Sequence, residues 1–234
     1  MLLFDLTTRH GARPSPFCWR AKLALKHKGL LHDEKACNYS DIRSIGDGRF
    51  KTVPVMQDGE VFVGGSLNIA EYLEKTYPDA PTLFPDDPHH RYAKFVEAWV
   101  DTSLQPQIFH TLAYDIFLLM PDAEQPYFRK TREARLGMTL EEARDLAPSK
   151  LPAAQASFLP LRRRLQEQPF LCGDAPAYAD YIVYGALKWQ RLCCDRELLS
   201  DAADPIHAWF SHIDGIAAAR APTSSGPHER FVGR

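Results

Sequence analysis

The chain opens with two apolar patterns of different period. Residues 2–6 form a short apolar run, which is typical of a largely buried strand. Helical spacing follows at i, i+4, i+7 and i+8, in Phe17, Ala21, Ala24 and Leu25. Ser15 is a favourable N-cap for this helix, Pro16 suits its first position, and Gly29 can end it in the left-handed conformation. The pattern therefore predicts a strand, a loop and a helix.

The pattern beyond this helix predicts three more strands and a second helix. Residues 31–39 have a weak strand pattern, and the polar stretch 40–49 indicates an irregular or short helical segment. Asp58-Gly59 between two apolar runs is a hairpin signal. Residues 67–77 have helical spacing, with Ser66 as the expected N-cap. With a right-handed crossover, this order predicts a mixed four-stranded sheet covered by helices.

Four prolines between positions 78 and 88 exclude a helix there and favour an ordered linker. The chain beyond them has helical patterns only. The expected helices lie at 91–104 and 107–120 (one helix kinked at Pro106, or two), at 126–136, in a short segment behind a Thr139–Glu142 capping box, at 153–168, at 177–194, and after Asp204-Pro205. We expect a domain at 1–78, a linker at 79–88, an all-helical domain at 89–220 and a loose tail at 221–234.

Composition and charge exclude several classes of function. Hydrophobic residues make up 45% and charged residues 25%, which are ordinary values for a soluble globular protein. A net charge of −2 argues against non-specific nucleic-acid binding. No apolar stretch approaches the roughly 20 residues that span a bilayer, and the N-terminus enters a strand at once, so we expect neither a membrane span nor a signal peptide. The 5 cysteines and 9 histidines lack metal-ligand spacing, so we expect no metal and a reducing, cytoplasmic location.

Ser15 is the first candidate for chemistry. A hydroxyl at a helix N-terminus just beyond a strand can hold an anion, and a thiolate is one such anion. Ser66, behind Gly64 and Gly65, opens the second helix and forms a similar site for a carboxylate. Spacing alone favours the simpler interpretation that Ser15 only caps its helix, and at Ser66 capping and anion binding can coexist.

Four motifs, taken in order, resemble the glutathione transferase superfamily. They are Ser15-Pro16-Phe17-Cys18, Val53-Pro54, Ser66 before Ile69-Ala70-Glu71-Tyr72-Leu73, and Gly173-Asp174-Ala175-Pro176-Ala177-Tyr178-Ala179-Asp180. The resemblance implies an α/β thioredoxin-like N-terminal domain with a mixed four-stranded sheet, followed by an all-α C-terminal domain. It also implies glutathione as cosubstrate, a small hydrophobic electrophile as second substrate, and a homodimer.

The resemblance gives each matched residue a role toward glutathione. Ser15 is the catalytic residue and stabilises the thiolate. Val53 pairs its backbone with the tripeptide, strand-fashion, ahead of a cis peptide bond at Pro54. Ser66 holds the γ-glutamyl carboxylate. Lys51, or less readily Arg43, meets the glycyl carboxylate.

Two positions depart from the family pattern. Gly65 stands where the family usually has Glu or Asp, which weakens the expectation of full glutathione affinity. Asp101 is a candidate to supply the missing carboxylate from a partner subunit. Ala177 stands in place of a Ser or Thr helix cap, a loss that costs about 1 kcal/mol. Asp180 remains able to accept backbone N–H groups there.

A narrower likeness links the chain to the bacterial β-aryl etherases and the fungal etherase-related transferases. It rests on residues 15–29 and on residues 127–137 with Leu140-Glu141, within a long helical insertion. Cleavage of β-aryl ethers by thiolate displacement is the activity that this likeness implies. The candidates to face the electrophile are Thr8, Arg9, His10, Phe109, His110, Tyr114 and Phe117, although the aromatic stripe also fits a buried core. Pairing with nearby acids is expected for Arg129, Lys130, Arg132 and Arg135.

These features together predict a glutathione transferase that acts on an apolar, aromatic electrophile, with a role in detoxification. Two alternatives stay open. Cys18 completes a C-x-x-C motif in which Ser15 replaces the first cysteine, so a glutathione-dependent thiol-disulfide reductase is one alternative. A non-catalytic binding protein of the same fold is the other, and Gly65 favours it. Loss of activity in Cys18→Ala, with Ser15→Ala spared, would identify the reductase.

Overall fold

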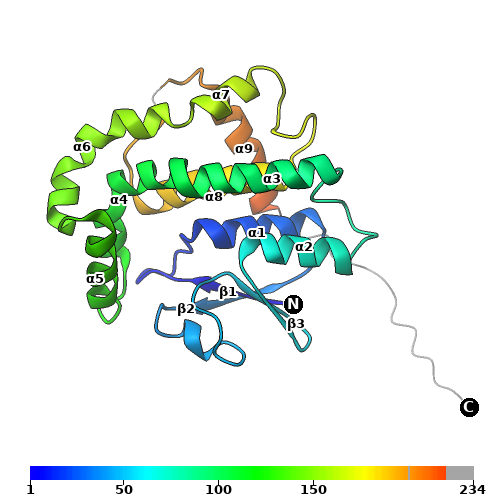
Figure 1. Cartoon of the computed structure of the whole chain (residues 1–234), viewed down its shortest axis with the longest axis horizontal. Coiled ribbons are helices and arrows are strands. Elements are labelled where there is room, and N and C mark those ends of the chain that lie inside the picture. The colour runs from blue at the N-terminus through cyan, green and yellow to red at the C-terminus, as the bar shows by residue number, and fades with distance from the viewer. Residues whose placement is uncertain (200, 220–234) are drawn as a thin grey trace, which may run out of the picture.

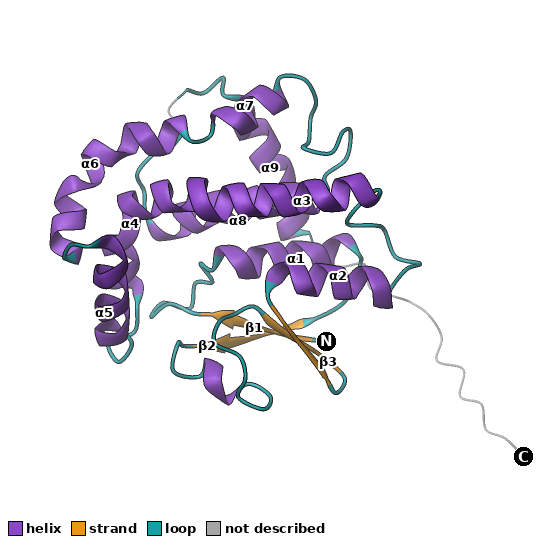
Figure 2. Ribbon diagram, in the orientation of Figure 1, coloured by secondary structure: helices purple, strands orange, loops and turns teal. Residues whose placement is uncertain are grey.

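A mixed sheet forms the first part of the computed structural model, which describes residues 1–199 and 201–219 (Figure 1). Its elements are β1 (Leu2–Leu6), α1 (Pro16–His27), β2 (Asp33–Cys37), the 3-10 turn η1 (Ile42–Ser44), β3 (Val55–Asp58), β4 (Val61–Gly64) and α2 (Ser66–Thr76). The strand order is β2-β1-β3-β4, with β1 parallel to β2 and antiparallel to β3. Helices α1 and α2 lie on the side of the sheet that faces the helical part (Figure 2). The predicted mixed four-stranded sheet is confirmed.

In its described residues, the second part of the chain consists of helices joined by loops, with one isolated β-bridge between Phe170 and Gly173. Its elements are α3 (Asp87–Trp99), the π-helical segment η2 (Val100–Leu104), α4 (Gln105–Leu119), α5 (Gln125–Leu136), α6 (Leu140–Ala156), α7 (Leu159–Leu165), α8 (Tyr178–Cys193) and α9 (Pro205–Ala218). Helix α3 runs into α4 without a break, because η2 widens the turn just before Pro106, whose ring nitrogen has no hydrogen to donate. The expected tail at 221–234 lies outside the described residues.

Three local expectations need correction. Ser66 is the first residue of α2 and not its N-cap, because Gly65 takes that place with a positive φ of 91°. Helix α6 is not short, since its 17 residues run through two prolines and bury an apolar stripe that packs against α4. The helix expected at 153–168 is divided, because α6 ends at Ala156 and α7 begins at Leu159.

The start of α8 is stabilised by Asp180, which is fully buried. Its carboxylate accepts the backbone N–H of Ala177 at 3.0 Å, the backbone N–H of Leu171 at 2.9 Å and the Trp209 indole N–H at 2.8 Å. The carboxylate therefore replaces the hydroxyl cap that Ala177 cannot provide, as expected from the sequence.

The sheet layer and the helical layer share one buried core. Helix α1 packs against α8, where the absence of a side chain at Gly185 allows a close approach; a Cβ there would lie 2.4 Å from the Pro16 carbonyl oxygen. Arg20 on α1 is fully buried and pairs with Asp101 at 2.6 Å and Glu97 at 3.4 Å. In the described part of the chain, no helix is both long and apolar enough to cross a bilayer.

Candidate functional site

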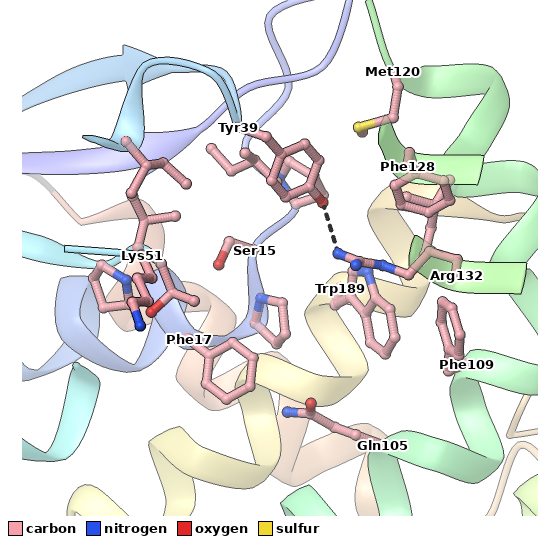
Figure 3. Close-up of a pocket in the computed structure, with 18 of the residues that line it drawn as sticks. Ser15, Phe17, Tyr39, Lys51, Gln105, Phe109, Met120, Phe128, Arg132 and Trp189 are labelled. Atoms are coloured by element: carbon pink, nitrogen blue, oxygen red, sulfur yellow. Dashed lines mark hydrogen bonds between the residues drawn. The ribbon is translucent and has the colours of Figure 1, made fainter. Parts of the chain in front are cut away.

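A cavity of about 380 Å³ opens between the sheet layer and the helices, with α1 and α2 starting on one side and α4, α5 and α8 on the other (Figure 3). Of the site residues expected from the sequence, it brings together Ser15, Lys51, Val53, Pro54, Gly65, Ser66 and Phe109. These residues come from both parts of the chain, so the cavity depends on how the two layers are packed.

Ser15 lies at the N-terminus of α1, between the two ends of the cavity (Figure 3). It is 7% exposed, and its Oγ accepts the backbone N–H of Cys18 at 3.3 Å, which makes Ser15 the N-cap of this helix. A hydroxyl that accepts one hydrogen bond still has its own hydrogen to donate. An anion in the cavity would therefore meet both this O–H and the positive end of the α1 dipole.

One end of the cavity is suited to a peptide. The Val53–Pro54 bond is cis, as the family resemblance implies. Within the described residues, Val53 makes no backbone hydrogen bond, so its N–H and C=O are available to an extended ligand. The nearby N-terminus of α2, at Gly65 and Ser66, and the Lys51 side chain are suited to carboxylates.

Cys18 does not line the cavity. Its side chain is fully buried, and its thiol lies 4.0 Å from the Phe4 carbonyl oxygen. Burial and the neighbouring Asp5 carboxylate raise the pKa of the Cys18 thiol well above its usual value. Cys18 is therefore a protonated core residue at neutral pH.

Several residues expected to face the electrophile lie elsewhere. The Thr8 hydroxyl accepts the Ala12 N–H at 3.0 Å in a turn, and Arg9 pairs with Asp122. Neither these residues nor His10, His110, Tyr114 and Phe117 line the cavity. The turn and the ion pair hold Thr8 and Arg9 away from it, whereas Tyr114 and Phe117 pack against each other with ring centroids 6.0 Å apart.

The far end of the cavity is aromatic. Phe109 on α4 stacks on Trp189 of α8, with ring centroids 6.1 Å apart and planes inclined by 14°. Phe128 of α5 and Tyr39, which follows β2, complete this wall (Figure 3). Of these residues, only Phe109 was expected to face the electrophile, since the direction of the Trp189 side chain depends on how α8 packs against its neighbours.

Helix α5 adds two arginines to the cavity, although both were expected to pair with nearby acids. Arg129 does pair, with Glu133 at 2.7 Å and Glu141 at 2.8 Å. Arg132 and Arg135 line the cavity instead. Arg132 and Arg135 are spaced i, i+3, which is the sequence signal for a shared helical face, but this spacing does not say what the face meets.

Gln105 is a further residue that the sequence did not single out. It is the first residue of α4, is 7% exposed, and extends its amide into the lower part of the cavity (Figure 3). Among the described residues, its Nε2 has no hydrogen-bond partner. A buried donor without an acceptor is costly, so this amide is suited to an oxygen atom of a ligand.

Asp101, the candidate for a contribution across subunits, is engaged within its own chain by Arg20. Its side chain remains 35% exposed. The described residues contain no group of three or more His, Cys, Asp or Glu side chains placed to hold a metal ion.

A thioredoxin-like sheet, a cis-proline segment beside a helix N-terminus and a helical second part define the class of glutathione-binding transferase folds. Profiles of the glutathione S-transferase N-terminal and C-terminal domains match residues 10–81 and 92–210, so the chain belongs to the glutathione S-transferase family. The family uses glutathione as its cosubstrate, which agrees with the cosubstrate predicted from the sequence.

Solved structures and curated relatives agree with this assignment. The chain is similar to glutathione transferase GSTFuA3 from Phanerochaete chrysosporium, with a TM-score of 0.82, 25% identity, and coverage of 92% of this chain and 96% of that one. It is 28% identical over 220 residues to the glutathione S-transferase-like protein ustS of Aspergillus flavus, covering 79% of this chain and 76% of the relative. Glutathione S-transferase U10 of Arabidopsis thaliana is 32% identical over 106 residues. That match covers 44% of each chain, less than half of the plant relative.

Proposed function

We propose that this protein is a glutathione transferase of the etherase-related subgroup, in which Ser15 stabilises the glutathione thiolate. The observation that carries the proposal is the position of the Ser15 hydroxyl, at a helix N-terminus inside the cavity. The available backbone of Val53 lies to one side of it and the wall of Phe109 and Trp189 to the other. A tripeptide thiol and an aromatic electrophile would meet at this hydroxyl.

The chemistry requires that the thiolate be bound more tightly than the thiol. The pKa of a free cysteine thiol is about 8.5, so only a few per cent is ionised at neutral pH. Lowering that pKa by about two units needs roughly 2.7 kcal/mol of selective anion binding. The Ser15 O–H and the positive end of α1 favour the thiolate in this way.

The reaction is then a displacement. The thiolate sulfur attacks the electrophilic carbon, a carbon–sulfur bond forms, and the bond to the leaving group breaks with its electron pair. The thiol proton has already passed to water. With a β-aryl ether as substrate, the leaving group is an aryloxide, and this is the specific activity that we propose for the subgroup.

The proposal extends to the setting of the enzyme. We infer a homodimer that works in the cytoplasm on small hydrophobic electrophiles, in a detoxification role. The five free cysteines support a reducing compartment. Asp101, which is 35% exposed, remains our candidate to reach the glutathione of a partner subunit.

The alternatives have weaker support. A thiol-disulfide reductase needs an accessible thiolate, and Cys18 is fully buried with a raised pKa. A binding protein without catalysis was favoured by Gly65. In the structure, Gly65 is instead the N-cap of α2, with a positive φ of 91°, and the N-terminus of this helix can still hold a carboxylate.

Calorimetric titration of glutathione, read with an ultraviolet difference spectrum of the thiolate, tests the proposal. Wild type, Ser15→Ala and Cys18→Ala should all bind. The thiolate band at neutral pH should appear in wild type and Cys18→Ala and be lost in Ser15→Ala. Conjugation of chlorodinitrobenzene should fall by about tenfold to a hundredfold in Ser15→Ala alone, following the lost thiolate fraction. Absence of glutathione binding to wild type would contradict the proposal.

A further inference from the structure

The charged side chains that line the cavity are all positive. Three cationic side chains line it, those of Lys51, Arg132 and Arg135, and none of its described lining residues is Asp or Glu. Lys51 lies at the peptide end, whereas Arg132 lies beside the aromatic wall (Figure 3). The positive charge at the aromatic end is therefore separate from the groups that suit the carboxylates of glutathione.

Arg132 is held in place by neutral groups. Its guanidinium donates to the Thr131 Oγ1 at 3.0 Å and to the Tyr39 hydroxyl oxygen at 3.4 Å. Its Cζ lies 5.0 Å from the centre of the Phe128 ring and 5.6 Å from that of Tyr39. These contacts orient the planar group toward the cavity without neutralising it, and a partly buried cation favours an anionic ligand.

Arg135 and Tyr39 extend the same site. Arg135 follows Arg132 by three residues on α5, and its Cζ lies 5.3 Å from the centre of the Phe109 ring. Burial raises the pKa of Tyr39, so its phenol keeps its hydrogen at neutral pH. Because Tyr39 accepts from Arg132, this hydrogen is available to a ligand oxygen.

Arg129 provides the internal comparison. It lies on the same helix, with its Cζ 4.6 Å from the centre of the Phe117 ring, yet it pairs with two carboxylates, those of Glu133 and Glu141. Among the described residues, neither Arg132 nor Arg135 has such a partner. The presence of a carboxylate partner therefore depends on position: Arg129, which does not line the cavity, is paired, whereas the two arginines that line the cavity are not.

We propose that the electrophile is an aromatic compound with a carboxylate substituent, which Arg132 and Arg135 bind at the aromatic end of the cavity. This inference rests on the proposed function, since it names the class of the second substrate. A guanidinium matches the two oxygens of a carboxylate with paired N–H donors, and the wall of Phe109 and Trp189 receives the ring. The electrophilic carbon then points toward the thiolate at Ser15.

A pair of probes that differ only in charge tests this. Chlorodinitrobenzoate and its methyl ester share the ring, the nitro groups and the leaving group; in both, the glutathione sulfur bonds to the ring carbon and chloride leaves with the electron pair. The variants are Arg132→Gln and Arg135→Gln. Lys130→Gln is the matched control, because it removes the same charge from the same helix outside the cavity.

Wild type should prefer the acid, and added salt should reduce that preference. Each arginine variant should lower kcat/KM for the acid by about tenfold or more, and for the ester by less than about twofold. Lys130→Gln should change neither. Calorimetric affinity for glutathione should be unchanged in all variants.

Each contrary outcome has a distinct meaning. Equal losses on acid and ester, or no loss on either, would overturn the carboxylate site. A loss of glutathione affinity in the arginine variants would also overturn it, by assigning these side chains to the cosubstrate's own carboxylates. No conjugation of either probe by wild type, together with absent glutathione binding, would instead contradict the proposed function.

Discussion

Ser15 and Cys18 lie one helical turn apart, and burial gives them different chemistry. The Ser15 hydroxyl borders the cavity, while the Cys18 thiol points into the core beneath it. The two are joined by the N–H that Cys18 donates to Ser15. A C-x-x-C motif places its second residue on the inward side of the helix, so replacing the first cysteine with serine leaves a hydroxyl as the group that can reach a ligand.

Gln105 leads to a prediction at this scale. Replacing it with leucine removes a buried donor that lacks a partner, so Gln105→Leu should raise the free energy of unfolding of the ligand-free protein by about 1 kcal/mol. The same change should weaken the binding of glutathione or of an S-alkyl glutathione by about fivefold to tenfold, because a ligand oxygen loses its donor. Thermal melts and calorimetry measure the two effects.

The control is Gln107→Leu, the same substitution on the same helix outside the cavity. It should leave affinity for both ligands unchanged. Higher stability of Gln105→Leu with unaltered affinity for both ligands would show that the amide does not serve the site.

At the scale of the element, local signals predicted turns and helix caps well. The Asp58-Gly59 turn, the Ser15 cap and the Asp180 cap follow from neighbouring residues, and the structure has all three. The aromatic and basic lining of the cavity does not follow in this way. Whether Arg132 meets an acid or a cavity depends on how α5 is placed against Tyr39, far away in the sequence. Sequence spacing alone predicts which residues share a helical face, but it does not predict which part of the molecule that face contacts.

The close packing of α8 against α1 at Gly185 leads to a prediction at the scale of the element. Because a Cβ at this position would lie 2.4 Å from the Pro16 carbonyl oxygen, Gly185→Ala must push α8 away from the first turn of α1. We expect a loss of about 1–3 kcal/mol in the free energy of unfolding, typical of an overpacked core. The displaced turn begins at Ser15, so the glutathione thiolate band should weaken as well.

Gly215→Ala is the control for this experiment. A Cβ at Gly215, inside α9, would meet nothing within 4 Å, so the alanine should stabilise the helix by up to about 1 kcal/mol. Urea titrations of both variants measure the stability changes. A Gly185→Ala protein as stable as wild type would mean that the contact between α1 and α8 adjusts without cost.

At the scale of the whole molecule, the two parts of the chain depend on each other. The buried cluster that holds Leu25 of α1 and Ile69 of α2 continues through Val100 into Ile182 of α8. A helix of the first part thus completes the core of the second. The cavity lies along the same boundary, so its geometry requires both layers to be folded.

The molecule should therefore unfold in a single cooperative transition. Trp19 of α1 reports on the boundary, where its ring centroid lies 6.2 Å from that of Tyr184, and Trp209 reports on the helical core, where it donates to Asp180. Two variants, each keeping only one of these two tryptophans, allow the two signals to be read separately. The urea midpoint read from Trp19 should coincide with the midpoint read from Trp209. Arg20→Ala leaves Asp101 and Glu97 without their buried partner. It should therefore lower the free energy of unfolding by up to about 3 kcal/mol and shift both urea midpoints down together. Two separate transitions, or a shift of the Trp19 signal alone, would show that the layers fold independently and that the cavity forms only when they dock.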